Sequence, residues 1–118
     1  MSRLRSKNTK PEVMVRSLLH RLGYRFRKNQ KGLPGTPDIV LRKYKTVVFV
    51  HGCFWHQHPG CVEASRPKSK KDFWDRKLDG NVARDKKHCA TLEKNWKVLR
   101  VWECEVEKDP LKVARALD

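Results

Sequence analysis

The sequence predicts an α/β domain in which a mixed β-sheet is flanked by helices. Three observations indicate this fold class: 118 residues suffice for one hydrophobic core, β-rich runs stand in the first half and near the end, and stretches of helical periodicity surround them. The expected order, α-β-β-β-α-α-β-α, is typical of a sheet covered by helices. Because neither internal repeats nor a linker interrupt the chain, residues 1–118 are predicted to form one domain.

The first helix is expected over residues 10–22. Thr9 is the predicted N-cap, and Glu12 three residues later has the spacing of a capping box, with Pro11 in the tolerant first turn. The apolar positions with helical spacing are Val15, Leu18, Leu19 and Leu22. Gly23 is expected to end the helix, because glycine readily takes the left-handed conformation found after a helix.

Three runs of β-forming residues predict strands at 24–27, 38–41 and 46–50. Residues 32–37 are predicted to be a loop, because two prolines and two glycines there break any regular element. The short segment 42–45 separates the second and third strands, which are therefore expected to form a hairpin.

The second half of the chain is predicted to begin irregularly and to become mostly helical. The expected elements are an irregular segment at 51–69, helices at 70–79 and 81–95, a strand at 97–102 and a closing helix at 109–117. Asn81 is the expected N-cap of the second of these helices. Cys89 lies on the apolar stripe of that helix, where a buried thiol is expected, and Trp96 and Trp102 are expected in the core.

Basic residues dominate the composition. The chain has 28 Lys and Arg against 13 Asp and Glu, a net charge of +15. Residues 1–31 contain ten basic residues and one acidic residue, and residues 66–88 contain nine and four. One basic run is often only a solvated helix face, but two on so basic a chain indicate a polyanionic partner, with nucleic acid expected. Binding should weaken steeply with salt, because each neutralised phosphate releases counterions.

The sequence also bounds the compartment. It contains no run of 18 apolar residues, and its N-terminus lacks the apolar stretch of a signal peptide. A cytoplasmic protein without a membrane partner is therefore expected. In that compartment the four cysteines are expected to be thiols or metal ligands rather than disulfides.

A cluster of cysteine and histidine residues predicts a structural zinc site. Residues 51–61 carry five possible ligands, and Cys104 stands far downstream, just past the strand at 97–102. Tetrahedral Zn²⁺ takes thiolates and imidazoles in sets of four, and the set that would close such a site is Cys53, His58, Cys61 and Cys104. The ion would tie an irregular loop to the end of a distant strand. The alternative is that Cys53 and Cys104 are small buried residues and the histidines lie on the surface.

Asp38 opens a predicted strand after Thr36-Pro37, where a carboxylate can be held rigidly at a sheet edge. Mg²⁺ prefers one or two carboxylates together with water and phosphate oxygens, although turn formation explains most Pro-Asp pairs. His51 and His56 stand on either side of Cys53 and are not needed by the zinc set. Phosphodiester hydrolysis would need such a metal and a base for water, and Glu12 could orient one histidine.

Four segments, in this order, resemble the very-short-patch-repair (Vsr) mismatch endonucleases. They are Leu33-Pro34-Gly35-Thr36-Pro37-Asp38-Ile39-Val40, Val48-Phe49-Val50-His51-Gly52-Cys53-Phe54-Trp55-His56, Phe73-Trp74 with Asn81-Val82-Ala83-Arg84-Asp85, and Val101-Trp102-Glu103-Cys104. The resemblance extends from about Arg5 to Cys104. It implies a restriction-endonuclease-like fold and nicking of the thymine-containing strand at T·G mismatches. The strand that ends Phe49-Val50-His51 lacks the acid-x-Lys of most restriction-type nucleases, a substitution that the Vsr pattern shares.

The resemblance also implies roles for individual residues. Asp38 looks like the metal-binding aspartate, and the backbone carbonyl of Val50 would be the second protein ligand of a catalytic Mg²⁺. His56 resembles the general base that activates water, with Glu12 supporting it, and His51 resembles the histidine near the scissile phosphate.

The remaining implied roles concern the zinc ion and the DNA. The zinc ligands of the family match the set chosen above from spacing. Phe54, Trp55 and Trp74 resemble aromatic residues that wedge into the DNA stack, where a mismatched step yields most easily; the alternative for Trp55 and Trp74 is core packing. The cations expected to contact DNA are Lys7, Lys70, Lys71 and Arg84.

The function predicted from these observations is Mg²⁺-dependent nicking of double-stranded DNA at T·G mismatches. One alternative is a less discriminating nickase of the same fold, and another is a zinc-stabilised DNA-binding module without activity. The expected partners are mismatched DNA and mismatch-repair proteins, and the resemblance suggests a monomer.

Overall fold

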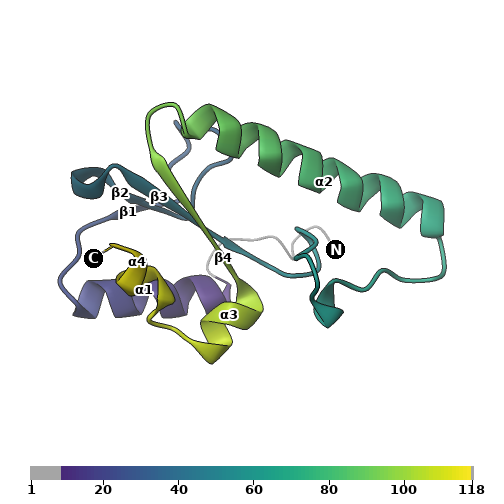
Figure 1. Ribbon diagram of the computed structural model, residues 1–118, viewed down its shortest axis with the longest axis horizontal. Coiled ribbons are helices and arrows are strands. Elements are labelled where there is room, and N and C mark those ends of the chain that lie inside the picture. Colours follow the sequence, from purple (N-terminus) through teal and green to yellow (C-terminus); the bar gives the residue numbers. More distant parts are fainter. Residues whose placement is uncertain (1–8, 118) are drawn as a thin grey trace.

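A computed structural model of the chain describes residues 9–117, so the expected DNA contact at Lys7 lies outside the described residues. The elements are α1 (Lys10–Arg21), β1 (Arg27–Lys28), β2 (Ile39–Leu41), η2 (Arg42–Tyr44), β3 (Thr46–His51), η3 (Val62–Ala64), α2 (Lys71–Leu92), β4 (Lys97–Trp102), α3 (Glu103–Lys108) and α4 (Lys112–Leu117). Figure 1 shows α2 on one side of the sheet and α1, α3 and α4 on the other. The predicted α/β class, a mixed sheet flanked by helices, is confirmed.

The sheet has the strand order β1-β2-β3-β4. β2 is antiparallel to both β1 and β3, whereas β3 and β4 run parallel, so the sheet is mixed. A parallel pair needs a long crossover connection, and the segment containing α2 supplies it. His51 at the end of β3 is paired with Trp102 at the end of β4. The loop after β3 and the start of α3 are thereby brought to one edge of the sheet.

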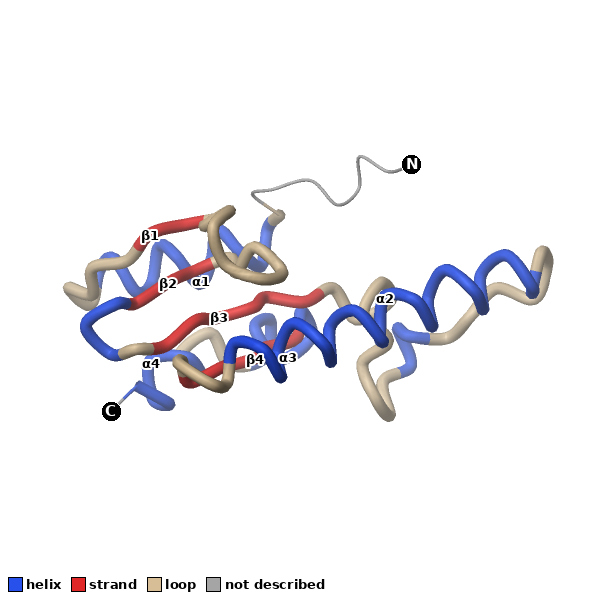
Figure 2. The backbone as a smooth tube through the Cα atoms, turned by 90° about the horizontal axis from the view of Figure 1, so that it is seen from above, coloured by secondary structure: helices blue, strands red, loops and turns tan. Residues whose placement is uncertain are grey.

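Alternating side chains of the buried strands build two small cores. Val48 on β3 packs with Val15 and Leu19 of α1 on one face, and Val47 and Phe49 pack with residues of the other face that include Leu92 of α2. In Figure 2, α2 runs along β3 and β4 and extends beyond the sheet. Because successive strand residues point to opposite faces, one strand of largely apolar sequence can serve both cores. Within residues 9–117, no helix is apolar and long enough to cross a bilayer.

Helix α1 begins at Lys10, as predicted, but the capping bond expected of Thr9 is absent. The hydroxyl group of Thr9 donates a hydrogen bond to Glu12 Oε1 at 3.2 Å and caps no backbone group of the helix. The end agrees with the prediction. The N–H of Gly23 donates to the carbonyl of His20 and that of Tyr24 to the carbonyl of Leu19, as in a Schellman motif, with Gly23 at a φ of 90°. At the start of the helix, the carboxyl group of Glu12 accepts hydrogen bonds from the side chains of Thr9 and Arg16.

Three predicted elements were wrong in extent. The two helices expected at 70–79 and 81–95 are the single helix α2, because a mid-helix Gly80 costs only about 1 kcal/mol and Leu78 and Leu92 are buried against the rest of the fold. Asn81 is therefore inside a helix and not an N-cap. The strand expected at 24–27 is reduced to β1, two residues long.

The C-terminal helix also differs from the prediction over 109–117. That helix is shortened to α4, which begins after Pro110, and an additional short helix, α3, lies before Pro110. Proline restricts the residue before it to extended conformations, and Asp109 indeed has a φ of −146° and a ψ of 80°. Helix α3, which contains Cys104, was not predicted; Glu105 Oε1 accepts a hydrogen bond from the N–H of Trp102 at 3.1 Å and stabilises its start.

Candidate active site and metal-binding cluster

Asp38 lies where β2 stops pairing with β3. β2 begins at Ile39, which is paired with Val48 of β3. Asp38 and Val50 therefore lie just beyond the paired residues of these two strands. The N–H of Val50 donates instead to Asp38 Oδ2 at 2.7 Å. Because N–H and C=O of one residue point the same way from an extended strand, the carbonyl of Val50 is directed to the same side as this carboxylate. The two oxygen ligands expected of Asp38 and Val50 are thus brought together.

The carboxyl group of Asp38 is held in an unfavourable environment for charge. Burial raises its pKa to about 7, and repulsion from Glu12 together with a hydrogen bond to Glu12 adds to the rise, against the lowering effect of the Val50 N–H and of Arg16. Glu12 itself is only 5% exposed, and its Oε2 accepts from Arg16 Nη1 at 3.3 Å. A bound cation would stabilise the negative charge of these two adjacent carboxyl groups, of which Glu12 is buried and Asp38 half-buried.

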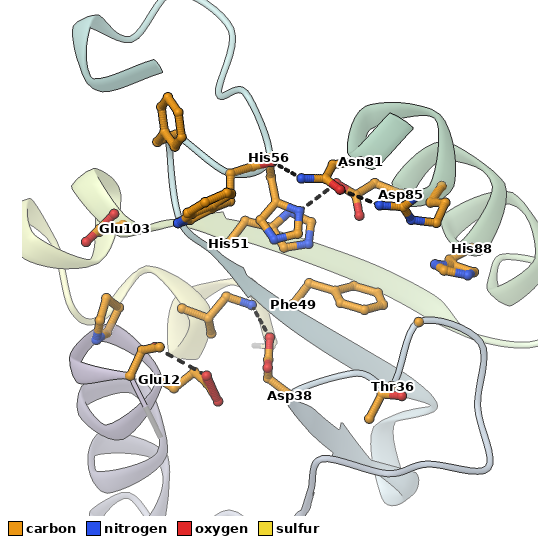
Figure 3. Close-up of a pocket in the computed structure, with 18 of the residues that line it drawn as sticks. Glu12, Thr36, Asp38, Phe49, His51, His56, Asn81, Asp85, His88 and Glu103 are labelled. Atoms are coloured by element: carbon orange, nitrogen blue, oxygen red, sulfur yellow. Dashed lines mark hydrogen bonds and ion pairs between the residues drawn. The ribbon is translucent and has the colours of Figure 1, made fainter. Parts of the chain in front are cut away.

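His51 and His56 stack on each other above this carboxylate pair (Figure 3). Their ring centroids are 3.9 Å apart and the ring planes are nearly parallel, at 6°. His51 ends β3 and is 4% exposed, and its Nδ1 is buried with no hydrogen-bond partner among the described residues. Burial, and then the neighbouring His56, lower the pKa of His51 to about 3, so this imidazole is neutral at physiological pH.

Asp85 of α2 orients the second histidine. Its Oδ2 and His56 Nδ1 are 2.6 Å apart. Burial raises the pKa of Asp85, but the hydrogen bond to His56 and the electrostatic attraction to His56 and Arg100 outweigh it, so the pKa is lowered and the group stays ionised. Glu12 was expected to support His56. In the structure Asp85 contacts His56, and Glu12 lies beside Asp38, on the other side of the sheet edge from α2 (Figure 3).

Asp85 was missed because nothing in its helical sequence distinguishes it from the other acids of α2. Asn81 stands one helical turn earlier and shares a face of α2 with Asp85, but this spacing alone does not indicate a histidine partner. Asn81 Nδ2 donates to the carbonyl of Trp55 at 2.9 Å, so two successive turns of α2 hold Trp55 and His56 of the same loop. These two bonds from the helix add to the hydrogen bonds that the loop makes within itself.

All of these groups line one open cleft of about 1100 Å³ between the N-terminal end of α1, the end of β3 and α2. The catalytic residues expected from the sequence that line it are Glu12, Asp38, His51 and His56. The cleft therefore collects side chains separated by more than 70 positions when Asp85 is included. Its width leaves room for a substrate larger than a single small molecule.

Aromatic rings form one wall of the cleft. Phe54 lies 5.1 Å from Trp55 and 5.5 Å from Trp74, measured between ring centroids, and Phe73 lies 5.1 Å from Trp74. Phe54, Trp55 and Trp74 are half-buried, and Phe73 is 53% exposed. These rings touch one another at the cleft and belong to neither of the two cores, so core packing does not explain Trp55 or Trp74.

The cations expected to contact DNA lie around this wall. Lys70 and Lys71 are exposed at the start of α2, and Lys71 Nζ pairs with Asp75 at 2.7 Å. Arg84 is exposed on α2, lines the cleft and donates a hydrogen bond to Asn81.

The three residues expected in the core differ in burial. Trp102 is 8% exposed, in the core as predicted. Trp96 is only partly buried against the second core, and Cys89 is half-buried beside it.

The predicted metal ligands meet in space. One ligating atom from each of the four residues lies within 4.8 Å of the others, in the group Cys53, His58, Cys61 and Cys104. His58 Nδ1 is 3.6 Å from Cys53 Sγ and 3.4 Å from Cys104 Sγ. These distances are close to the ~3.6 Å that would separate an N and an S ligand of one tetrahedral zinc ion. Burial, together with the neighbouring thiol groups, raises the pKa of Cys53 to about 12 against a lowering backbone hydrogen bond at Cys104. A cation at the centre would reverse this by stabilising the thiolate. The cluster can hold a metal ion, as predicted.

Trp102 separates the two sites. Its ring stacks on His58 with centroids 4.4 Å apart and a 9° interplanar angle, and it presents an edge to His51 at 5.3 Å. The cysteine cluster and the histidine pair are therefore neighbours that contact the same indole ring. The cysteine cluster can form only because β3 and β4 end side by side, which brings Cys104 to the loop after β3.

Comparison with known proteins agrees with this geometry. Residues 1–62 match the family model described as DNA mismatch endonuclease Vsr. The chain is 54% identical over 107 residues to type II nicking enzyme V.XorIIP of Xanthomonas oryzae, covering 90% of this chain and 78% of that protein. It is also 54% identical over 108 residues to type II nicking enzyme V.NmeAIP of Neisseria meningitidis, with 91% and 76% covered.

A third relative carries the family name itself. The chain is 40% identical over 105 residues to DNA mismatch endonuclease Vsr of Escherichia coli, which covers 88% of this chain and 67% of that protein. The similarity thus spans both the segment matched by the family model and the second half, where α2 and β4 lie. Taken with the fold and the cleft, these matches establish that the chain belongs to the Vsr family of DNA endonucleases.

Proposed function

We propose that the protein nicks double-stranded DNA at T·G mismatches in a Mg²⁺-dependent reaction within very-short-patch repair. The observation that carries the proposal is the meeting of Asp38, Val50 and the His51–His56 pair at one open cleft. A carboxylate with a backbone carbonyl is a suitable hard-oxygen site, and an imidazole beside it is a suitable proton acceptor.

Asp38 and the Val50 carbonyl would hold the Mg²⁺, with Glu12 close enough to add negative charge. When bound, the ion supplies stabilisation of the negative charge that develops on the phosphate. The adjacent carboxyl groups of Asp38 and Glu12 would themselves attract a cation to this part of the cleft. The aromatic wall faces the same space, so a DNA strand bound there can meet both.

His56 is the group best placed to accept a proton from water. Asp85 holds its Nδ1 at 2.6 Å, which fixes the ring and stabilises the positive charge that results from proton uptake. The water oxygen forms a bond to phosphorus while the bond from phosphorus to the leaving nucleoside oxygen breaks, and that oxygen takes its proton from solvent. His51 stays neutral because of its burial, so it acts by a hydrogen bond towards the phosphate and not as a charge.

Cys53, His58, Cys61 and Cys104 would bind a structural Zn²⁺. Thiolates and imidazole are the ligands that zinc prefers, and four protein ligands leave no open position for chemistry. The ion would join the loop after β3 to the start of α3.

The aromatic wall and the cations beside it would bind the DNA. Phe54, Trp55 and Trp74 would insert into the DNA stack, where a mispaired step costs least to open. The cations that would contact the neighbouring phosphates are Lys70, Lys71 and Arg84.

The test is cleavage of end-labelled duplexes that differ only in one base, carrying T·G or T·A at the same position, with and without Mg²⁺. We expect one nick, in the thymine strand of the mismatched duplex, that requires Mg²⁺. No cutting of either duplex in the presence of Mg²⁺ would overturn the proposal, and it would then favour a DNA-binding module without activity.

A second candidate is a less discriminating nickase with the same chemistry. It is favoured by the names of two relatives that are each 54% identical to this chain and are called type II nicking enzymes. Equal nicking of the T·G and T·A duplexes would identify this function. We further propose that the protein acts as a cytoplasmic monomer and that mismatch-repair proteins assist it.

A further inference from the structure

A second cavity lies at the opposite end of the sheet from the cleft. It has a volume of about 340 Å³ and shares no lining residue with the cleft. Its walls are the segment Gly23–Arg27 after α1, Val40 of β2, and η2, the turn Arg42–Tyr44 between β2 and β3. In Figure 2 this turn lies at the far end of β3 from the loop that leads to α2. We call this cavity the basic pocket.

Among the described residues, the basic pocket is lined by four cations and no acid. These are Arg25, Arg27, Arg42 and Lys43, all exposed. Over the described part of the chain, none of the four side chains makes an ion pair, whereas Arg66 and Lys71 on the α2 side are paired with aspartates. Cations gathered around a hollow repel one another and attract an anion into it. Within residues 9–117, the charge of the basic pocket therefore lacks an acidic partner.

Two tyrosines shape the same pocket. The rings of Tyr24 and Tyr44 are 5.4 Å apart at 60°, and Tyr44 is 40% exposed. Phenol and guanidinium groups both donate hydrogen bonds to phosphate oxygens. Arginine is particularly suited to this ligand, because its planar fork can bind two oxygens at once. Several arginines and two tyrosines around one hollow can bind more oxygen atoms than a single carboxylate offers. The lining therefore fits a phosphate group better than a carboxylate.

Helix α1 sets the distance between the two cavities. Thr9 and Glu12 at its start line the cleft, and Gly23 and Tyr24 just after its end line the basic pocket. Its 12 residues extend about 18 Å at 1.5 Å per residue, which equals about five base pairs of duplex DNA at 3.4 Å each. Double-stranded DNA is the substrate expected of this family, and a duplex of more than about five base pairs could reach both cavities.

We propose that the basic pocket binds a phosphate of the DNA backbone about five base pairs from the nicked bond. This inference rests on DNA being the substrate of the cleft and adds a second, distant anchor to it. The anchor carries no base information, because phosphate contacts fix position and register and do not read sequence. It would hold the duplex while the aromatic wall opens the mismatched step.

The test compares Arg42→Gln/Lys43→Gln with a control that loses the same charge elsewhere, Lys94→Gln/Lys108→Gln. All four residues are exposed, and Lys94 and Lys108 line neither cavity. Kd is measured without Mg²⁺ against salt, on a long duplex and on duplexes cut back to about three base pairs on one side or the other of the nick position. One phosphate contact contributes a slope of about 0.9 in log Kd against log salt.

On the long duplex, the pocket variant should bind ~5–10-fold more weakly at physiological salt and lose about one unit of salt slope. On the duplex cut back on the pocket side it should equal the unsubstituted protein, while the control shows no dependence on duplex length. An equal loss for both variants, or an equal loss on every duplex, would overturn the proposal. So would saturable binding of inorganic phosphate at Arg42 without any length dependence, since that identifies a small-anion site.

Because η2 is an exposed turn, we expect the melting temperature of the pocket variant to be unchanged. An unchanged melting temperature excludes a folding defect as the cause of weaker binding. Binding is read without turnover on both matched and mismatched duplexes. A protein that fails to prefer T·G, or fails to nick, would therefore contradict the proposed function while leaving the result for the basic pocket intact.

Discussion

The two polar clusters at the end of β3 are neighbours with opposite designs. The cysteine cluster has four soft ligands that converge on one point and surround it. The cleft instead holds two carboxyl groups that repel each other and a stacked pair of histidines, and it remains open to a large ligand. A single ion can satisfy the first cluster completely. The second can be satisfied only by a cation and a substrate together, so it retains an energetic cost in the free protein.

The comparison is most strongly tested at Asp38, where we expect the largest effect on activity. Asp38→Ala removes the carboxylate that is shared with the Val50 N–H. Because the charge stabilisation by a metal is worth several kcal/mol, nicking should fall by ~10³-fold or more, with Kd for DNA nearly unchanged. Single-turnover cleavage and a binding assay on the same duplex measure this. A variant that still nicks within tenfold of the parent would place the metal elsewhere.

In the cysteine cluster, loss of one ligand should lower the stability of the fold. Cys104→Ala leaves only three ligands from the set, so the bound metal should be lost and the free energy of unfolding should fall by several kcal/mol, since metal binding and folding are coupled. Cys89→Ala is the matched control, because Cys89 lies on α2 outside the cluster. Metal content by atomic emission and a thermal melt decide the matter; equal metal content in the two variants would contradict the assignment.

A smaller effect is expected at Asp85. Asp85→Asn keeps the shape of the group but removes the negative charge 2.6 Å from His56 Nδ1. Groups that orient such a ligand or base typically contribute 10–100-fold, so we expect a loss of ~10–100-fold in the cleavage rate and little change in Kd. Asp79→Asn, on the same helix with its ion pair to Arg66, serves as the control, and an equal loss there would argue for a purely structural role.

The smallest expected effect is a gain of stability in the cleft. The pKa of Asp38 is raised from 3.8 to about 7 in the folded protein, so its contribution to stability is present below pH 4 and is lost as the pH rises through about 7. Asp38→Asn, which still accepts from the Val50 N–H, removes that loss. At about 1.4 kcal/mol per pKa unit, a rise from 3.8 to about 7 would correspond to ~4 kcal/mol, which the partial exposure of Asp38 and solvent screening reduce. Without added Mg²⁺, the variant should therefore be more stable than the parent by ~1–2 kcal/mol at pH 8 and by less than ~1 kcal/mol at pH 4.

Chemical denaturation at the two pH values measures this difference. A variant that is less stable than the parent at pH 8 would show that Asp38 is not held at an energetic cost. Addition of Mg²⁺ should narrow the gap, since a cation bound at Asp38 stabilises only the parent.

Much of the site was accessible from sequence because its ligands have distinctive chemistry and lie close together in the chain. Cys53, His58 and Cys61 fall within nine positions, and the distant Cys104 comes just after a strand, so donor chemistry and spacing chose the set that the structure brings together. The apolar periodicity of α1 and the β-rich runs of β2 and β3 likewise located these elements. Extents were less accessible: α2 continues through Gly80 because packing at Leu78 and Leu92 outweighs a local preference.

The sequence by itself determined the elements, the charge and the donor chemistry, since these depend on residue types and on spacing along one chain. Only the tertiary structure decided which side chain each acid contacts. Asp85 meets His56, 29 residues away, and Glu12 meets Asp38, 26 positions away, because α2 and α1 approach the end of β3 from opposite sides of the sheet (Figure 1). A carboxylate carries no mark of its partner in its own sequence, and the packing of helices on a sheet assigns it one.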